Sequence, residues 1–475
     1  AAAQVARGRS RTSWRVALGL LLAAAGQALF TQPGCTLPAA ALLFGGLVAA
    51  TAALWPPVDV GVPRERPRLA LADLLICTAL AAVLLPVFLA DLSGARTSHE
   101  DEPMWTTVGS GAFHTFFIER DLFGPFWREH YNTWGYYNPQ VGKYLIGASL
   151  YAAGYQEKLD VSPEPIADVG LLAAARLPSA LLGVASCLAL YGVVTLVSDR
   201  RHGLLASGLM AGGSLLPLMS ARAMVDAPAL AFSMLGLLGT LLTLRALRAG
   251  QQRAFLLAAT TGAACGLAAG VKLNGGLVFG VAVLALALEA VLALRSGRSP
   301  LAALACLGVA GAWAWAMFFA TNPFLYPDPL GGVREMQKFN AFVGGFSLET
   351  PRIPQGKVRA LWDSVSTYGP LGRAGLPGDQ LLLLAGALRL ALAARDPGEW
   401  WRRSWGPLAL WVLVSYVMIG LWLPVDWDRY YLPLQPVNAA LQALGVLWAA
   451  DAALALARRP AAGRQPGESS VERAP

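Results

Sequence analysis

Residues 169–197, VGLLAAARLPSALLGVASCLALYGVVTLV, form an apolar run with a single charged side chain, that of Arg176. A helix needs about 20 apolar residues to cross a hydrocarbon core of about 30 Å. The run is rich in Leu and Ala and shows no alternation, which favours a helix over a strand of a membrane barrel. Because a helix satisfies its own backbone hydrogen bonds in lipid, we predict that this run spans a membrane.

Runs of the same kind recur along the whole 475-residue chain, which is 56% hydrophobic and only 14% charged. Soluble domains usually carry about 25% charged residues, so this composition excludes a soluble globular protein. The sequence predicts an all-α polytopic membrane protein with about 12 transmembrane helices. The predicted spans are residues 14–30, 38–55, 69–90, 169–197, 203–219, 227–246, 254–271, 275–294, 301–320, 379–395, 405–423 and 431–451.

The basic residues predict how these spans are oriented. An even number of spans places both termini on one side of the membrane. The segments on that side hold twenty arginines, whereas the short loops on the other side hold only Arg222, Lys272 and Arg429. Because basic residues accumulate in cytoplasmic loops, we expect both termini in the cytoplasm. Topology therefore accounts for the net charge of +8 without a nucleic-acid partner.

This orientation places two long segments, 91–168 and 321–378, outside the cytoplasm. The first is predicted to contain two short helices, near 103–118 and 139–153. The expected units are 1–68 with a cytoplasmic tail and a helical hairpin, 69–320 with the membrane core and the first outer loop, 321–378 with the second outer loop, 379–451 with the last transmembrane helices, and 452–475 with a disordered cytoplasmic tail.

Polar and ionisable residues collect at the predicted outer ends of the spans. Charged groups at the membrane boundary cost free energy, so they favour a functional interpretation. Carboxylates are suited to proton transfer and cations to binding an anion such as phosphate, which predicts one outward-facing site. Its candidate residues are His99, Asp101, Glu102, Asn138, Lys143, Arg176, Arg222, Asp226, Lys272, Arg429 and Tyr430.

Each candidate also has a structural alternative. Asp101 or Glu102 before Pro103, Asn138 before Pro139 and Asp226 before Pro228 resemble the caps of helix N-termini. The lysines and arginines could extend to lipid headgroups. His99 could be a local hydrogen-bonding partner. The conjunction of these residues on one predicted side favours a site over any single alternative.

These residues lie in motifs that resemble those of the polytopic glycosyltransferases of the GT-C superfamily, and most closely the branch with protein O-mannosyltransferases and bacterial aminoarabinose transferases. The resemblance covers approximately residues 69–450. Its motifs are, in chain order, Asp101-Glu102, Asn138-Pro139-Gln140-Val141-Gly142-Lys143, Arg176 to Ala180, Arg222 with Asp226 to Pro228, Gly266 to Lys272, and Arg429 to Pro433. The family has His and Pro where this chain has Asn138 and Gln140, and no large soluble C-terminal domain follows as in oligosaccharyltransferases.

The resemblance implies a sugar donor on a polyprenyl phosphate and an acceptor that is a lipid, a glycan or a protein. An acceptor hydroxyl needs a carboxylate to take its proton, for which Asp101 is the candidate, with Glu102 as an orienting residue or second acid. One base and one displacement imply inversion at the anomeric carbon. The leaving phosphate needs cations, and the candidates are Lys143, Arg176, Arg222, Lys272 and Arg429.

The resemblance also allows a divalent cation (Mg, Mn or Zn) between carboxylates and phosphate, with Asp101, Glu102 and Asp226 as candidate ligands, although the sequence does not require one. We expect the second outer loop, 321–378, to cover the site and contact the acceptor. The expected location is a bacterial plasma membrane, with the active site outside the cytoplasm.

Two other function classes remain open. One is a transporter or flippase of a lipid-linked or small polar substrate, and the other is a protein that only binds the lipid-linked sugar. Transporter sites usually lie near the bilayer midplane, often within inverted repeats. In this sequence the ionisable residues lie at the predicted outer edge, which favours an enzyme.

Overall fold

The computed structural model describes residues 71–90, 92–94, 98–129, 139–161, 165–346, 356–395, 401, 404–422 and 427–457. Within these residues every regular element is a helix, which confirms the predicted all-α class. The predicted spans 14–30 and 38–55, the site candidate Asn138 and most of the C-terminal tail lie outside the described residues.

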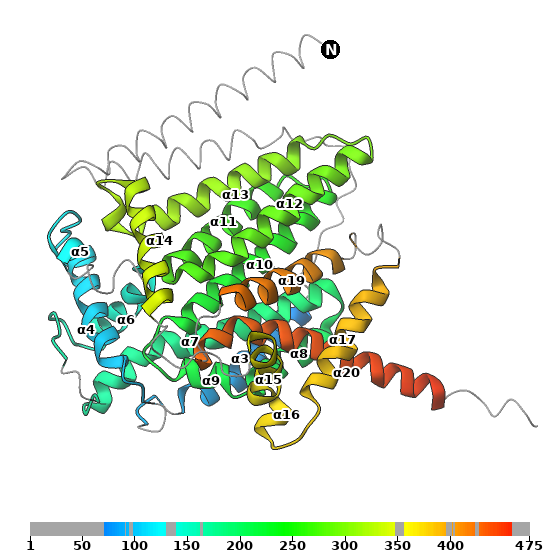
Figure 1. The fold of residues 1–475 in the computed structure, drawn as a ribbon, viewed down its shortest axis with the longest axis horizontal. Helices are drawn as coiled ribbons and strands as arrows, with labels where there is room; N and C mark the ends of the chain where they lie inside the picture. Colours follow the sequence, from blue (N-terminus) through cyan, green and yellow to red (C-terminus); the bar gives the residue numbers. More distant parts are fainter. Residues whose placement is uncertain are drawn as a thin grey trace, which may run out of the picture.

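Four long helices form the centre of the molecule. They are α10 (Asp226–Arg248), α11 (Ala254–Val271), α12 (Leu277–Arg295) and α13 (Leu301–Ala320). Figure 1 shows them side by side, and α11 packs against both α10 and α13. A Cβ atom at Gly262 would clash with the carbonyl oxygen of Ala310, and one at Gly266 with that of Ala314. Glycines four residues apart therefore allow α11 and α13 to approach closely, as small residues do in membrane helices.

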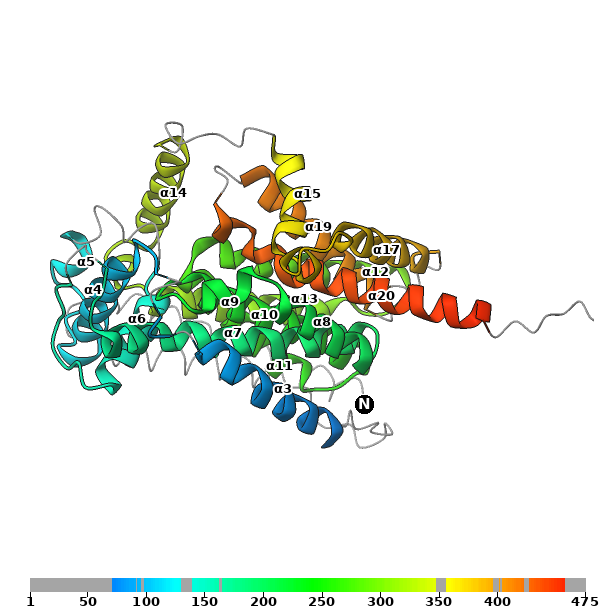
Figure 2. The same ribbon diagram turned by 90° about the horizontal axis from the view of Figure 1, so that it is seen from below.

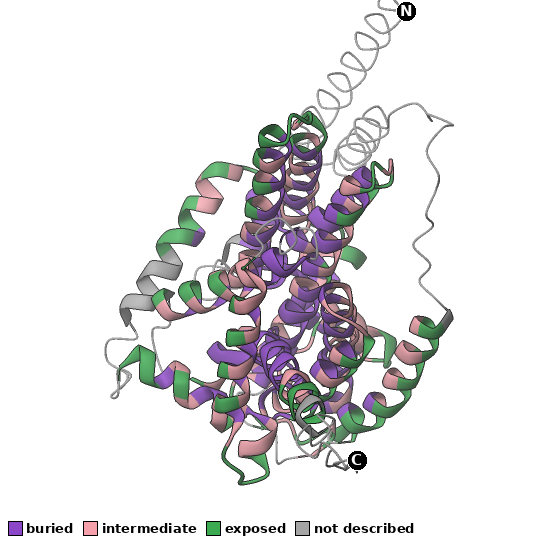
Figure 3. Ribbon diagram, turned by 90° about the vertical axis from the view of Figure 1, so that its right-hand side faces the viewer, coloured by how far each residue is buried: buried purple, intermediate pink, exposed green. Residues whose placement is uncertain are grey.

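Further helices surround this centre. The 29-residue helix α7 (Val169–Val197) packs against α10, and both α3 (Leu71–Leu89) and α8 (Arg200–Gly212) pack against α7. Helix α20 (Gln435–Ala457) packs against α8 and α17 (Asp379–Ala393), and α19 (Trp405–Trp422) packs against α12. Buried residues concentrate in the inner helices (Figure 3), whereas only 11% of the apolar part of α3 is buried. Helix α3 is therefore peripheral.

The first long segment contains the two short helices that the sequence predicted. Helix α4 (Glu102–Phe113) continues into one π-helical turn, η2 (His114–Ile118), and α6 (Val141–Ala152) packs against α4. A shorter helix, α5 (Phe126–Glu129), lies between them in the sequence. Helix α6 also packs against α7 and α11, so this group covers one end of the central bundle (Figure 1).

The described parts of the second long segment, 321–346 and 356–378, are largely helical, although the segment was expected as a loop. It contains the 3-10 turn η4 (Pro323–Leu325), α14 (Pro329–Phe346), α15 (Lys357–Tyr368) and α16 (Pro370–Arg373). Helices α14 and α15 rise from the same side of the molecule (Figure 2). The Lys357 ammonium donates a hydrogen bond to the carbonyl of Leu421 over 3.0 Å, which ties α15 to the end of α19.

Seven helices of the described residues are long and apolar enough to cross a membrane. All seven begin and end within about three residues of their predicted spans, and 169–197, 254–271 and 301–320 have the predicted bounds. The number of twelve spans is not confirmed, because α17 has only 15 residues and α19 is among the shorter apolar helices. The chain is thus a multi-pass helical membrane protein.

The predicted span 203–219 is wrong, because two shorter helices replace it. Helix α8 ends at Gly212 and α9 (Leu215–Ser220) begins after a break at Gly213 and Ser214. The Ser214 amide donates to the carbonyl of Tyr368, and the Arg373 guanidinium donates to that of Gly213 over 3.0 Å. At the Gly-Gly-Ser sequence the helical hydrogen bonds are interrupted, and hydrogen bonds to α15 and α16 replace them.

Candidate active site

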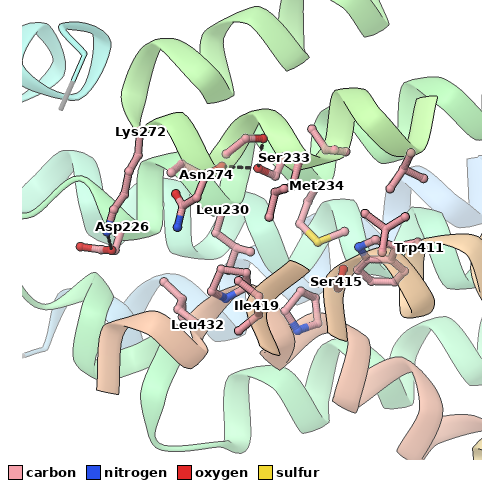
Figure 4. A pocket seen from close by; sticks show the side chains of 18 of the residues that line it. Asp226, Leu230, Ser233, Met234, Lys272, Asn274, Trp411, Ser415, Ile419 and Leu432 are labelled. Carbon is pink, nitrogen blue, oxygen red and sulfur yellow. Dashed lines mark hydrogen bonds and ion pairs between the residues drawn. The ribbon is translucent and has the colours of Figure 1, made fainter. Parts of the chain in front are cut away.

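A cleft lies between α10, α12, α19 and η5 (Asp428–Leu434), the 3-10 helix that precedes α20. Its volume is about 670 Å³ with the open mouth included. One end is polar and contains Asp226 from the first turn of α10, Lys272 from the end of α11, and Arg429 from η5. Figure 4 shows Asp226 and Lys272 together at this end.

The remainder of the cleft is apolar. Away from the charged end the side chains that Figure 4 labels include Leu230, Ser233 and Met234 from α10 and Ser415 and Ile419 from α19, and Trp411 lies at the far side. Among the described residues that line this part, Ser233, Asn274 and Ser415 have small polar side chains, and the largely apolar ones include Leu230, Met234, Val278, Val281, Trp411, Val414 and Ile419. A cleft with cations at one end and an apolar length complements an amphiphile with an anionic head.

Asp226 and Lys272 form a largely buried ion pair. The Lys272 ammonium lies 2.7 Å from Oδ1 of Asp226, and the side chains are 12% and 4% exposed respectively. Val225, not Asp226, occupies the N-cap position of α10. The ammonium also lies 5.6 Å from the ring centroid of Tyr430. The helix-cap alternative for Asp226 and the headgroup alternative for Lys272 are therefore both wrong in this structure.

Asp101 lies in the N-cap position of α4, but its carboxylate makes no capping hydrogen bond. Instead Oδ2 accepts a hydrogen bond from Nη1 of Arg429 over 2.8 Å, and the carboxylate side chain is 30% exposed. The Asp101 amide donates to Nδ1 of His99 over 3.1 Å, so that nitrogen is an acceptor and His99 is a local partner. Arg429 connects Asp101 to the cleft, because it also lines the charged end.

Glu102 and Arg176 form a pair that is almost completely buried. Nε and Nη2 of Arg176 each donate to one carboxylate oxygen of Glu102 over 2.7 Å, and the side chains are 0% and 2% exposed. Glu102 also accepts the amides of His99 and Ala223, and Arg176 donates to the carbonyls of Leu92 and Gly94. The pair joins α4, α7 and the turn before α10. This geometry favours a positioning role for both residues: for Glu102 this is one of the two roles expected from the sequence, and for Arg176 it replaces the expected phosphate contact.

Two further groups lie beside Arg429. The guanidinium of Arg222 lies 3.6 Å from Oδ2 of Asp428, an ion pair that the sequence did not predict. The ring of Trp427 stacks on that of Tyr430, with centroids 5.5 Å apart and planes at 11°. The Arg429 guanidinium lies 4.6 Å from the Trp427 centroid and 5.9 Å from that of Tyr430. The two rings therefore limit where the guanidinium can move.

The sequence did not predict that α19 forms one wall of the cleft. Ser415 is the one serine in the apolar run 405–422, which is a weak signal. Trp411 had no signal, because a tryptophan in a predicted span is expected to face lipid or core. Only the packing of α19 against α12 brings both to the cleft.

Lys143 is buried at the start of α6, with 1% of its surface exposed. The headgroup alternative for this lysine is therefore wrong. The neighbouring Gly142 packs against Val225 and Val271, which directly precede Asp226 and Lys272. The start of α6 thus lies behind the charged end of the cleft. Asn138 lies outside the described residues, so its expected role stays a prediction.

Burial lowers the pKa of Lys143 from 10.5 to about 7. In the unfolded chain this ammonium keeps its proton up to about pH 10. Between these values the unfolded chain binds more protons, so this lysine makes the free energy of unfolding rise with pH from about 7 to about 10. We predict that Lys143→Met removes this contribution. Thermal unfolding in detergent at pH 6 to 10 tests it, and parallel curves for both proteins would contradict it.

The candidate carboxylates do not assemble a metal site. Asp101 is bound by Arg429, Glu102 by Arg176 and Asp226 by Lys272, so each is already neutralised by a cation. No group of three His, Cys, Asp or Glu side chains in the described part of the chain is placed to bind a metal ion. The described carboxylates in this arrangement do not form a site for a divalent cation, and a role for such a cation stays a prediction.

A family described as dolichyl-phosphate-mannose-protein mannosyltransferase matches residues 124–325, which is less than half of the chain. The matched part contains Lys143, Arg176, Arg222, Asp226 and Lys272. No curated protein matches the sequence.

Several solved structures are similar to the chain. One is the archaeal oligosaccharyltransferase AglB from Archaeoglobus fulgidus in complex with an inhibitory peptide and a dolichol-phosphate, with a TM-score of 0.50, 16% identity, and coverage of 83% of this chain and 52% of AglB. Another is an oligosaccharyltransferase of the same organism with Zn and sulfate (TM-score 0.49, 17% identity, 81% and 51% covered). A third is the S. cerevisiae Pmt1-Pmt2 protein O-mannosyltransferase complex bound to its sugar donor (TM-score 0.41, 18% identity, 60% and 36% covered). The likeness to AglB establishes a shared fold, and this chain spans about half of AglB's length.

Proposed function

We propose that this chain, which has the fold of the GT-C superfamily of membrane glycosyltransferases, transfers a sugar from a polyprenyl-phosphate donor to an acceptor hydroxyl. The observation that carries the proposal is the cleft with Lys272 and Arg429 at one end and an apolar length along α10, α12 and α19. The description of the family that matches residues 124–325 names a dolichyl-phosphate sugar, which is a donor of this chemical class.

The two ends of the cleft suit the two ends of such a donor. A phosphate diester head carries a negative charge, and Lys272 and Arg429 are the cations that line the charged end of the cleft. An isoprenoid tail is apolar and gains free energy in contact with Leu230, Met234 and Val278. A soluble nucleotide-sugar has no apolar tail that could contact the apolar part of the cleft.

The proposed chemistry is a single displacement. The acceptor hydroxyl attacks the anomeric carbon and gives its proton to the carboxylate of Asp101. As the new bond between carbon and acceptor oxygen forms, the bond from the anomeric carbon to the phosphate oxygen breaks, and its electron pair stays on the phosphate. Lys272 and Arg429 stabilise the charge that develops there. Attack from the side opposite to the leaving group inverts the anomeric configuration.

The proposed site lies outside the cytoplasm, in the plasma membrane of a bacterium, and the positive-inside pattern supports the proposed side. Helices α14 and α15, which rise from one side of the molecule, are the elements proposed to contact the acceptor.

The direct test is transfer by the purified protein in detergent. The protein is mixed with a panel of polyprenyl-phosphate sugars and with lipid, glycan and peptide acceptors, and mass spectrometry follows free polyprenyl phosphate and glycosylated acceptor. We expect one donor to release polyprenyl phosphate in step with acceptor glycosylation. If the folded protein releases none but moves a lipid-linked sugar across proteoliposome membranes, the chain is a transporter and the proposal fails.

A further inference from the structure

Arg429 lies between the proposed base and the charged end of the cleft. It comes from η5, 328 residues after Asp101 in the chain, and its Nη1 donates to Oδ2 of Asp101 over 2.8 Å. The same side chain lines the cleft beside Lys272 and Asp226. One guanidinium is thus placed to contact either the carboxylate of Asp101 or an anionic head in the cleft.

A carboxylate bound by arginine is a poor general base. The hydrogen bond from Arg429 occupies Oδ2 of Asp101, so an acceptor hydroxyl has to compete with the guanidinium for this oxygen. For catalysis by Asp101 the arrangement in the structure has to change. A bound phosphate offers Arg429 another anion, with geometry suited to bidentate hydrogen bonds.

Among the three cations that pair with Asp101, Glu102 and Asp226, Arg429 belongs to the most exposed pair. The side chains of this pair are 19% and 30% exposed, against 12% and 4% for Lys272 with Asp226 and 0% and 2% for Arg176 with Glu102. Partly exposed ion pairs contribute little free energy, whereas separating buried ones costs much more. The Trp427 and Tyr430 rings keep the guanidinium near the cleft when it leaves Asp101.

We infer that Arg429 is the positioning residue of the proposed base: it binds Asp101 until a polyprenyl phosphate enters the cleft, then transfers its hydrogen bonds to the phosphate and frees the carboxylate. The inference rests on the proposed function and adds to it that Asp101 and the donor phosphate compete for one arginine. The carboxylate becomes a base only when a donor is bound.

The competition is measured as binding, without turnover. The probe is farnesyl phosphate, a water-soluble short-chain polyprenyl phosphate, titrated into purified protein in neutral detergent. Removal of the competitor in Asp101→Asn is expected to lower the Kd about fivefold, the scale of a partly exposed ion pair. Arg429→Gln is expected to raise the Kd. In the Arg429→Gln background, the added Asp101→Asn is expected to leave the Kd unchanged.

The double variant separates competition from general electrostatics. If Asp101→Asn tightens binding equally with and without Arg429, a nearby negative charge was removed and the inference is overturned. It is also overturned if Asp101→Asn has no effect on the wild-type protein. Glu100→Gln, which neutralises the exposed neighbouring carboxylate, is the matched control and should leave the Kd unchanged. Absence of binding to every variant would overturn the donor assignment itself, whereas an unaltered Kd with intact sugar transfer would overturn only the role of Arg429.

Discussion

Glu102→Gln is expected to lower the free energy of unfolding by about 3–5 kcal/mol, because it leaves the guanidinium of Arg176 buried without a counter-charge. Glu102 also accepts hydrogen bonds from the amides of His99 and Ala223. The substitution therefore weakens the contacts of Glu102 with three residues, Arg176, His99 and Ala223. Thermal unfolding of the purified protein in detergent measures the effect, and the yield of folded protein should fall with it.

The matched control is Glu119→Gln. Glu119 also forms a 2.7 Å ion pair, with Lys158, but both side chains are more than 40% exposed. Exposed pairs contribute about 0–1 kcal/mol, so this variant should unfold close to the wild type. Equal shifts for Glu102→Gln and Glu119→Gln would mean that burial of the Glu102–Arg176 pair does not stabilise the fold.

Asp101→Asn is expected to lower kcat by about 10²–10⁴-fold, the usual contribution of a general base. The substitution preserves shape but removes the group that accepts the acceptor's proton. Since Asp101 makes no capping hydrogen bond in α4, the fold should be retained. Release of polyprenyl phosphate from the donor found by the panel assay gives kcat, and thermal unfolding verifies the fold.

Glu100→Gln is the comparison for this variant, because Glu100 is an exposed carboxylate next to Asp101. It should retain the wild-type kcat. An Asp101→Asn protein that turns over as fast as Glu100→Gln would exclude Asp101 as the base, and a different acceptor of the proton would then be needed.

The sequence identified many of the residues at the site, but it did not decide their roles. The pattern of ionisable residues at predicted span ends located Asp226, Lys272 and Arg429, which line the cleft. It named Asp101 as the base but left Glu102 as either an orienting residue or a second acid. In the structure both carboxylate oxygens of the buried Glu102 accept hydrogen bonds from Arg176. The carboxylate of Asp101 instead accepts one from Arg429, which lines the cleft. Adjacent residues on a helix start point in different directions, which a motif does not record.

The sequence by itself determined that the chain is helical and membrane-spanning, and where helices such as 169–197 and 254–271 begin and end. These properties are local, since the length of an apolar run and the hydrogen bonds of a helix depend on neighbouring residues only. The tertiary structure decided which charges meet, as with Asp101 and Arg429, and where an apolar run breaks, as at Gly213. Both depend on partners far along the chain, because Arg429 lies 328 residues after Asp101 and Tyr368 lies more than a hundred residues after the break, and no local pattern contains them.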